Sequence, residues 1–153
     1  MIREHDYRVT VRWSGDTGAG YRDYTRDHDV LAEGKPTLQG SADPVFRGVP
    51  ERWNPEDLLV AALAECHMLS FLSLCARARI AVTDYRDTAA GIMREGAGHP
   101  GRFTEVVLRP QVTVADPAMI ERAAALHQEA HEQCFIANSV NFPVRHEPTT
   151  VAN

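Results

Sequence analysis

Residues 54–79, NPEDLLVAALAECHMLSFLSLCARAR, decide the fold of this chain. Asn54 is suited to cap a helix, Pro55 fits the first helical position, and the acidic residues that follow are favoured by the helix dipole. The rest of the stretch is apolar on nearly every side, which predicts a helix over residues 55–79 that is buried all round. A few strands of one small domain cannot surround such a helix, so we expect a second copy of the chain to cover part of it.

The composition is that of an ordinary globular protein. The chain has 153 residues, 44% hydrophobic and 24% charged, which predicts one domain over residues 1–153. Its net charge of −5 comes without a basic block, which argues against a nucleic-acid partner. The charged N-terminus lacks the apolar stretch of an export signal, so we expect a cytoplasmic protein. The apolar stretch 58–80 favours a buried soluble helix over a membrane span, because it is interrupted by Glu65, His67, Arg77 and Arg79.

The N-terminal third has the pattern of short strands and loops. Apolar and polar residues alternate over residues 7–13, which predicts a half-buried strand. After a glycine-rich turn the chain returns over residues 21–30, and one face of this segment carries Arg22, Tyr24, Arg26, His28 and Val30. If Tyr24 and Val30 face inward, so do the two arginines. Residues 32–50 are rich in Gly and Pro and indicate a loop with at most one short strand.

The C-terminal half predicts further strands and one more helix. Residues 82–93 and 103–114 have strand patterns, joined by a long hairpin loop at 96–101. Asp116-Pro117 begins a second helix that runs to about Gln133, and a last strand follows over 140–146 with a short tail. The class is therefore α+β with antiparallel sheets.

The three cysteines are candidates for chemistry, because an odd count in a reducing compartment indicates free thiols. Cys66 lies in the middle of the long helix, where it is either a small buried hydrophobe or a reactive group. Cys75 follows nine residues later, about 180° round the helix, so these two cannot share a site. Cys134 lies at the end of the second helix, where the dipole disfavours a thiolate and makes it a poor attacker.

A reactive Cys66 needs a cation nearby, because a free thiol of pKa about 8.5 is mostly protonated at neutral pH. Arg22 or Arg26 could supply that cation, with a carboxylate to hold the guanidinium. Glu56 is the obvious carboxylate, but it precedes Cys66 by ten residues, or about 15 Å along a helix. Glu56 therefore either serves Cys66 across a dimer interface or is simply a first-turn acid.

A metal site is the rival hypothesis. His127, His131 and Cys134 recur at i, i+4 and i+7 on one helical face, and His and Cys are zinc ligands when a fourth group joins them. Cys66 or His67 could be that group. Two histidines one turn apart are also common without metal, and we expect no metal and no cofactor.

Two motifs resemble the OsmC/Ohr family, the osmotically inducible and organic hydroperoxide resistance proteins. The first is NPEDLLVAALAEC at residues 54–66, with its Asn-Pro-Glu helix start and a cysteine ten residues after the Glu. The second is CFIANSV at residues 134–140, which leads into the last strand. The resemblance implies an intertwined homodimer in which antiparallel sheets wrap long central helices.

The same resemblance implies a cysteine-based peroxidase. Cys66 matches the attacking cysteine, Cys134 the resolving cysteine, and Glu56 the acid that pairs with a catalytic arginine. The family reaction would reduce an organic hydroperoxide through a Cys66 sulfenic acid and a Cys66–Cys134 disulfide, which a dithiol reductant reopens. Arg26 is favoured as the arginine over the other two candidates, Arg22 and Arg47. The alternative is a non-catalytic binding or stress protein on the same fold.

Overall fold

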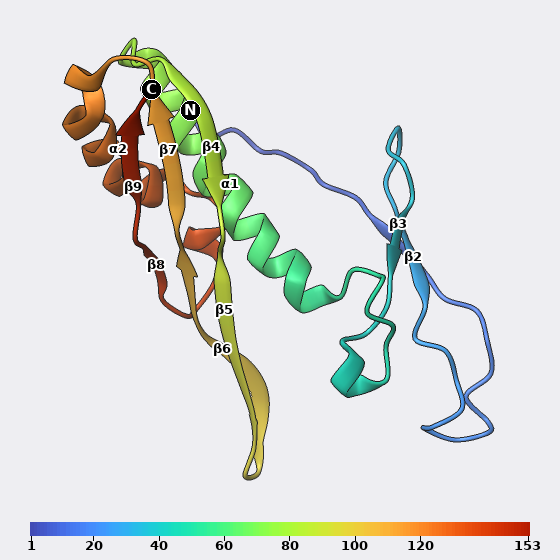
Figure 1. Cartoon of the computed structure of the whole chain (residues 1–153). Helices are drawn as coiled ribbons and strands as arrows, with labels where there is room; N and C mark the ends of the chain where they lie inside the picture. The colour runs from blue at the N-terminus through green and yellow to red at the C-terminus, as the bar shows by residue number, and fades with distance from the viewer. The chain divides into compact units, whose positions relative to one another are not determined.

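A computed structural model describes the backbone of residues 1–153 and every side chain except that of His99. The chain divides into two compact units, residues 1–58 and residues 59–153 (Figure 1), and each is described by itself. The prediction of a single domain over 1–153 stays a prediction.

Unit 1–58 contains one small antiparallel sheet of three strands in the order β1-β2-β3. The strands are β1 (Thr10–Arg12), β2 (His28–Leu31) and β3 (Leu38–Gly40), and the loop that follows holds the short 3₁₀ helix η1 (Pro44–Phe46). Of the strand predicted over residues 7–13, only residues 10–12 form a strand. The half-burial predicted for this strand is wrong for the single chain, because β1 is an edge strand and all of its residues are exposed.

A polar network fixes the loop between β3 and the long helix. The buried hydroxyl of Ser41 donates to Asp27 at 2.9 Å and accepts from the Val49 amide at 3.2 Å. Asp27 also pairs with Arg52 at 3.4 Å. The loop is tight at Gly48, where an added Cβ would lie 1.6 Å from the carbonyl oxygen of Ala42.

The long helix α1 runs from Pro55 to Arg77, as predicted to within two residues. The amide of Asp57 donates to the Asn54 side chain at 2.7 Å, which confirms the N-cap. Burial all round is wrong for the single chain: the buried side chains of α1 lie on one side, whereas Leu69 is 62% exposed. By length and composition α1 could cross a membrane, a property that it shares with the core helices of soluble proteins.

Unit 59–153 contains two three-stranded sheets, with the orders β4-β7-β9 and β5-β6-β8. The predicted long hairpin is present, but each of its arms is divided into two strands: β4 (Val82–Asp87) with β5 (Ala90–Gly96), and β6 (His99–Leu108) with β7 (Pro110–Val114). The predicted loop at 96–101 is shorter than expected. Left-handed φ angles at Ala97 and Gly98, 53° and 77°, close a tight turn there.

The C-terminal segment differs more from the prediction. Asp116 caps η2 (Pro117–Met119), and α2 (Ile120–Gln133) follows with the expected end. After η3 (Ala137–Ser139) come β8 (Val144–His146) and β9 (Thr149–Ala152), so the predicted tail is a strand. Because β8 lies parallel to β6, and β9 parallel to β7, the sheets are mixed. The α+β class is confirmed.

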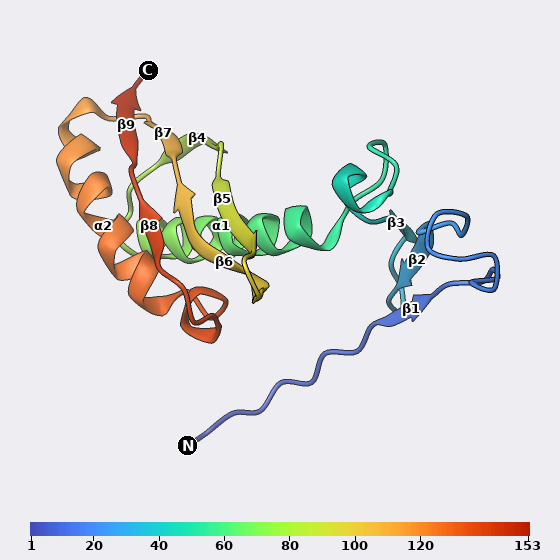
Figure 2. The ribbon, with the colours of Figure 1, turned by 90° about the horizontal axis from the view of Figure 1, so that it is seen from below.

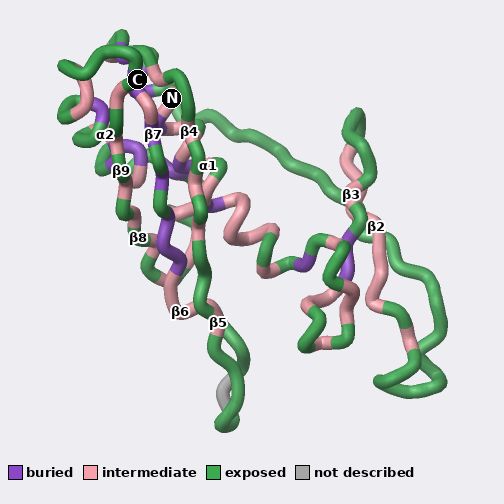
Figure 3. The backbone as a smooth tube through the Cα atoms, viewed as in Figure 1, coloured by how far each residue is buried: buried purple, intermediate pink, exposed green. Residues whose placement is uncertain are grey.

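Two apolar clusters form the core of unit 59–153, where α1 and α2 pack beside the strands (Figure 2). The larger joins α1 with β7 and α2 around Phe71, Val112 and Ala130, and the smaller joins α1 with β6 around Leu63 and Val106. Figure 3 shows this contrast: buried residues gather in unit 59–153, whereas unit 1–58 is mostly half-buried or exposed. The cysteines and the buried histidines lie in this packed unit.

Candidate functional site

Cys66 and Cys134 are brought together by α1 and the end of α2. Both are free thiols, and they lie near enough to each other that Cys66 helps to raise the pKa of the Cys134 thiol. Cys134 caps the C-terminus of α2 in an extended conformation, and its sulfur also accepts from the Ala137 amide at 3.5 Å.

The two thiols differ in their access to solvent. Cys66 is half-buried and opens into a groove of about 630 Å³, whereas Cys134 is 1% exposed. Apolar side chains on both sides of the groove are largely uncovered, with Leu69 62% and Phe135 81% exposed. A small molecule in this groove therefore meets Cys66 and not Cys134.

The charge state of Cys134 follows from its position. Burial, and to a smaller extent the contact with Cys66, raises the pKa of the Cys134 thiol to about 11, although the backbone amides of Ala137 and Ile136 oppose this. Cys134 therefore keeps its proton at neutral pH and is a poor attacker, as the sequence predicts. The dominant cause is burial and not the helix end that the sequence indicates.

Cys75 belongs to the core. It is 1% exposed within the larger apolar cluster, and burial raises the pKa of its thiol to about 11. Its predicted separation from the site of Cys66 agrees with this position, since Cys66 belongs to the groove.

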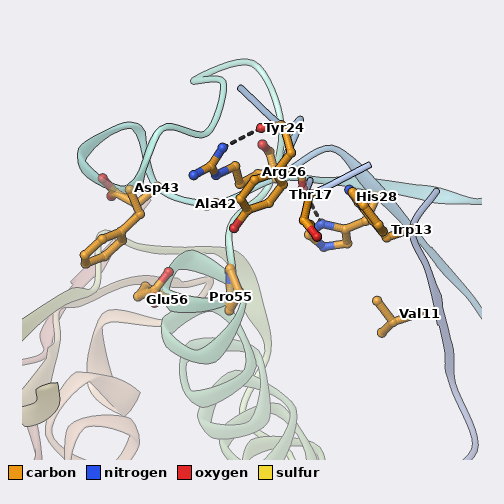
Figure 4. A pocket seen from close by; sticks show the side chains of 12 residues that line it. Val11, Trp13, Thr17, Tyr24, Arg26, His28, Ala42, Asp43, Pro55 and Glu56 are labelled. Atoms are coloured by element: carbon orange, nitrogen blue, oxygen red, sulfur yellow. Dashed lines mark hydrogen bonds between the residues drawn. The ribbon is translucent and has the colours of Figure 1, made fainter. Parts of the chain in front are cut away.

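Arg26 and Glu56 line a different cavity, in unit 1–58. This cavity has a volume of about 430 Å³ and mostly apolar walls that include Trp13, Tyr24 and Phe46 (Figure 4). The guanidinium of Arg26 lies 3.7 Å from the ring centre of Tyr24 and donates to the backbone carbonyls of Tyr21 and Tyr24. None of the ion pairs between described side chains includes Arg26 or Glu56.

The other two candidate arginines are less well held. Arg22 and Arg47 are both exposed, and Arg47 lies 5.9 Å from the ring centre of Tyr21. Arg47 has a left-handed φ of 69°, which follows from its place as the C-cap of η1. Of the three, only Arg26 lines the cavity that also holds Glu56.

Four histidines from three elements form a cluster inside unit 59–153, which we call the histidine cluster: His67, His127, His131 and His146. Nε2 of His67 lies 3.0 Å from Nδ1 of His127, and both rings are almost fully buried. His146 stacks on His67 and tilts against His131, with ring centres 5.6 and 5.3 Å apart. Desolvation, then the neighbouring imidazoles, lowers the pKa of His67 to about 4 and that of His127 to about 3.

The rival metal site is not supported. Among the described side chains no group of three His, Cys, Asp or Glu residues is placed to hold a metal ion, and this includes His127, His131 and Cys134. The reason is that the buried His127 ring turns toward His67 and stacks on Phe71 at 4.0 Å, while Cys134 turns toward Cys66.

Sequence reasoning missed two features of these sites. It treated His67 only as a possible metal ligand and did not include His146, because the contact between α1, α2 and β8 joins residues up to 79 positions apart. It also missed the aromatic environment of Arg26. The signal for the second was present, since Tyr21 and Tyr24 precede Arg26 by five and two residues.

The pair of neighbouring thiols and the mixed α+β fold define the class: an α+β protein with two free cysteines, of which one lines a groove and the other is buried. Comparison with known proteins gives the family. The model of the family described as OsmC-like protein matches residues 48–149, which include Glu56, Cys66 and Cys134 but not Arg26. The chain belongs to the OsmC-like family.

Solved structures agree with this. An OsmC-like protein of unknown function from Vibrio cholerae is 35% identical, covers 95% of this chain and 100% of its own, and superimposes with a TM-score of 0.84. An organic hydroperoxide resistance protein from Elizabethkingia anophelis shares the fold at 20% identity, with 99% and 100% coverage and a TM-score of 0.70. Among curated proteins, the uncharacterized protein YmaD of Bacillus subtilis is 20% identical over 91% of this chain and 89% of its own.

Proposed function

We propose that this protein is a thiol peroxidase that reduces organic hydroperoxides to alcohols, with Cys66 as the attacking cysteine and Cys134 as the resolving cysteine. The observation that carries the proposal is that these two free thiols are neighbours, one open to a groove and the other buried. Membership of a family that includes proteins named for organic hydroperoxide resistance supports it.

The reaction follows from these two environments. The Cys66 thiolate attacks the terminal oxygen of the hydroperoxide, the O–O bond breaks, and the alkoxide takes a proton to leave as the alcohol. Cys66 is then a sulfenic acid. Cys134 gives up its proton and attacks the Cys66 sulfur, water leaves, and a disulfide forms. An external dithiol reopens the disulfide and becomes oxidised itself, which suits a reducing compartment such as the cytoplasm.

The groove favours a substrate with an alkyl or aryl group. Leu69, Phe135 and Ile136 give it an apolar surface, and burial of such a group gains about 25 cal/mol for each Å² removed from water. Hydrogen peroxide has no group to bury there. We therefore expect organic hydroperoxides to react faster than hydrogen peroxide.

Arg26 and Glu56 complete the proposed site from a second copy of the chain. Glu56 and Cys66 lie ten residues, or about 15 Å, apart along α1 and cannot meet within it. The exposed apolar side chains of α1 and of the edge strand β1, such as Leu69 and Val11, supply surface that a second copy would cover. The functional molecule in this proposal is a homodimer, and its mass in solution tests this.

The peroxide-dependent disulfide is the test of the proposal. Reduced protein is mixed with one equivalent of cumene hydroperoxide, and the products are digested and analysed by mass spectrometry. We expect a Cys66–Cys134 disulfide and one equivalent of the alcohol. The matched variants are Cys66→Ser and Cys75→Ser, of which only the first should abolish the reaction. The proposal is wrong if both thiols stay free, or if Cys66→Ser consumes peroxide as fast as the wild type.

A further inference from the structure

Arg26 lies over the faces of two aromatic rings, in the short segment that precedes β2. Its guanidinium carbon is 3.7 Å from the ring centre of Tyr24 and 4.7 Å from that of Tyr21. Both distances are within the range in which the negative face of an aromatic ring attracts a cation. The rings therefore restrict where the guanidinium can go while leaving it charged.

Backbone carbonyls fix the rotation of the same group. Nη1 of Arg26 donates to the carbonyl oxygen of Tyr24, and Nη2 donates to that of Tyr21 (Figure 4 shows the first bond). A guanidinium has five N–H groups, so three remain for other acceptors. The arginine is thus held in one orientation and is still able to bind an anion.

The rings are themselves supported. Trp13 meets Tyr24 edge to face, with ring centres 6.1 Å apart, and its indole N–H donates to the Thr25 carbonyl at 2.7 Å. Tyr21 and Tyr24 also meet edge to face, at 6.4 Å. These contacts hold the aromatic rings in place without a ligand. The rings therefore keep the Arg26 side chain in one orientation before any ligand binds.

We propose that Tyr24 and Tyr21 are positioning residues, whose ring faces hold the Arg26 guanidinium in the orientation in which it stabilises the Cys66 thiolate of the second copy. This rests on the proposed function, in which Arg26 is the activating cation. Loss of a ring lets the long arginine side chain sample other rotamers, so that it spends less time beside the thiolate. The guanidinium of Arg26 stays charged, and only its average position relative to the thiolate changes.

The test compares alkylation of Cys66 across pH in full-length protein. Cys66 is labelled with iodoacetamide from pH 5 to 10 and quantified by mass spectrometry in the wild type, Arg26→Ala, Tyr24→Leu and Tyr24→Phe. We expect Arg26→Ala to move the midpoint to higher pH the most, Tyr24→Leu to move it less, and Tyr24→Phe to match the wild type because its ring remains. Peroxide-dependent oxidation of Tyr24→Leu should slow by about 2-fold to 30-fold, the range of a cation–π contact.

The outcomes separate this inference from the proposed function. If Arg26→Ala moves the midpoint and Tyr24→Leu does not, the positioning role is wrong and the proposed function stands. If Tyr24→Phe is as defective as Tyr24→Leu, the hydroxyl and not the ring is needed, and the inference again fails. If Arg26→Ala leaves the midpoint unchanged, Arg26 is not the activating cation, and that part of the proposed function falls with the inference.

A second pair of variants guards against a folding defect. Tyr21 is 61% exposed, so Tyr21→Leu should leave the thermal unfolding midpoint unchanged while moving the alkylation midpoint in the same direction as Tyr24→Leu. Tyr7→Leu is the matched control, because Tyr7 is 88% exposed and belongs to the same unit. An equal shift in Tyr7→Leu and Tyr21→Leu would overturn the positioning role.

Discussion

The two units hold their functional side chains by opposite means. In unit 59–153 Cys134, His67 and His127 are buried in the packed core, where desolvation keeps all three uncharged. In unit 1–58 Arg26 lies in an open cavity, where ring faces and carbonyl oxygens support a charge that burial would oppose. In this protein, burial holds the side chains that stay neutral, whereas ring faces and carbonyl oxygens hold the charged side chain of Arg26.

The largest expected effect is the loss of Cys66, because it removes the sulfur that we propose attacks the hydroperoxide. Cys66→Ser should lower the rate of hydroperoxide reduction by about 10³-fold or more, as removal of a nucleophile does in other enzymes. The rate is measured by alcohol formation with excess dithiothreitol. Cys75→Ala, from the same helix, should keep the wild-type rate, and a comparable loss in both variants would contradict the assignment.

Next in size is a core deletion that compares the two units directly. Phe71 is fully buried in the larger apolar cluster, so Phe71→Ala should lower the free energy of unfolding by about 3–5 kcal/mol. Phe46 is a half-buried wall of the cavity in unit 1–58, and Phe46→Ala should cost less than about 2 kcal/mol. Urea denaturation measures both. Equal losses would mean that the two units are equally well packed.

Acid should destabilise the packed unit through the histidine cluster. Burial lowers the pKa of His67 to about 4 and that of His127 to about 3, from an ordinary value of 6.5. From about pH 6.5 downward the unfolded chain therefore binds protons that the folded pair does not, and the free energy of unfolding falls until about pH 3. Each of the two histidines should contribute about 3 kcal/mol or more to this loss, since each pKa unit corresponds to about 1.4 kcal/mol.

The acid effect is measured by urea denaturation at several pH values. His127→Gln should reduce the slope of stability between pH 6.5 and 4, whereas the exposed His5→Gln should leave it unchanged. Carboxylates that titrate in the same pH range contribute equally to the slope in the wild type and in His127→Gln, so the difference between the two slopes isolates the contribution of the histidine. An unchanged slope in His127→Gln would show that the buried pair is not responsible.

The smallest effect concerns the polar network of unit 1–58. Ser41→Ala removes the hydroxyl that the Val49 amide donates to and that donates to Asp27, which keeps only its pair with Arg52, and should cost about 1–3 kcal/mol. Arg145→Ala, which removes exposed ion pairs to Glu105 and Glu147 in the other unit, should cost about 1 kcal/mol or less. The thermal unfolding midpoints of the two variants show which substitution costs more stability. A larger loss from Arg145→Ala would contradict the view that polar contacts matter more in unit 1–58.

Local signals in the sequence predict the helices well. Asn54 and Asp116 are caps whose side chains bond to amides within their own turn, so the starts of α1 and of the η2 turn before α2 follow from neighbouring residues. The pairing of Cys66 with Cys134 came from the motifs of a family and stays a prediction, although the two free thiols are neighbours in the structure.

The features that the sequence did not predict depend on contacts between residues that are distant in the sequence. The breaks between β4 and β5 and between β6 and β7 arise where two sheets diverge. The strand pattern of residues 82–93 does not indicate such a break. The sequence also predicts α1 to be buried on every side, because apolar composition does not say which chain supplies the cover. The histidine cluster combines residues from α1, α2 and β8, so only the packed structure could show it.

The contact between Cys66 and Cys134 has a consequence for survival of the protein under excess oxidant. A well-oriented group in the same molecule acts as if present at an effective molarity of about 10⁵–10⁸ M. A second hydroperoxide from dilute solution must compete with that neighbour before it can carry the sulfenic acid on to sulfinic acid, which is not readily reversed. If Cys66 and Cys134 act as proposed, the neighbouring thiol should protect Cys66 from overoxidation, and many turnovers should precede inactivation.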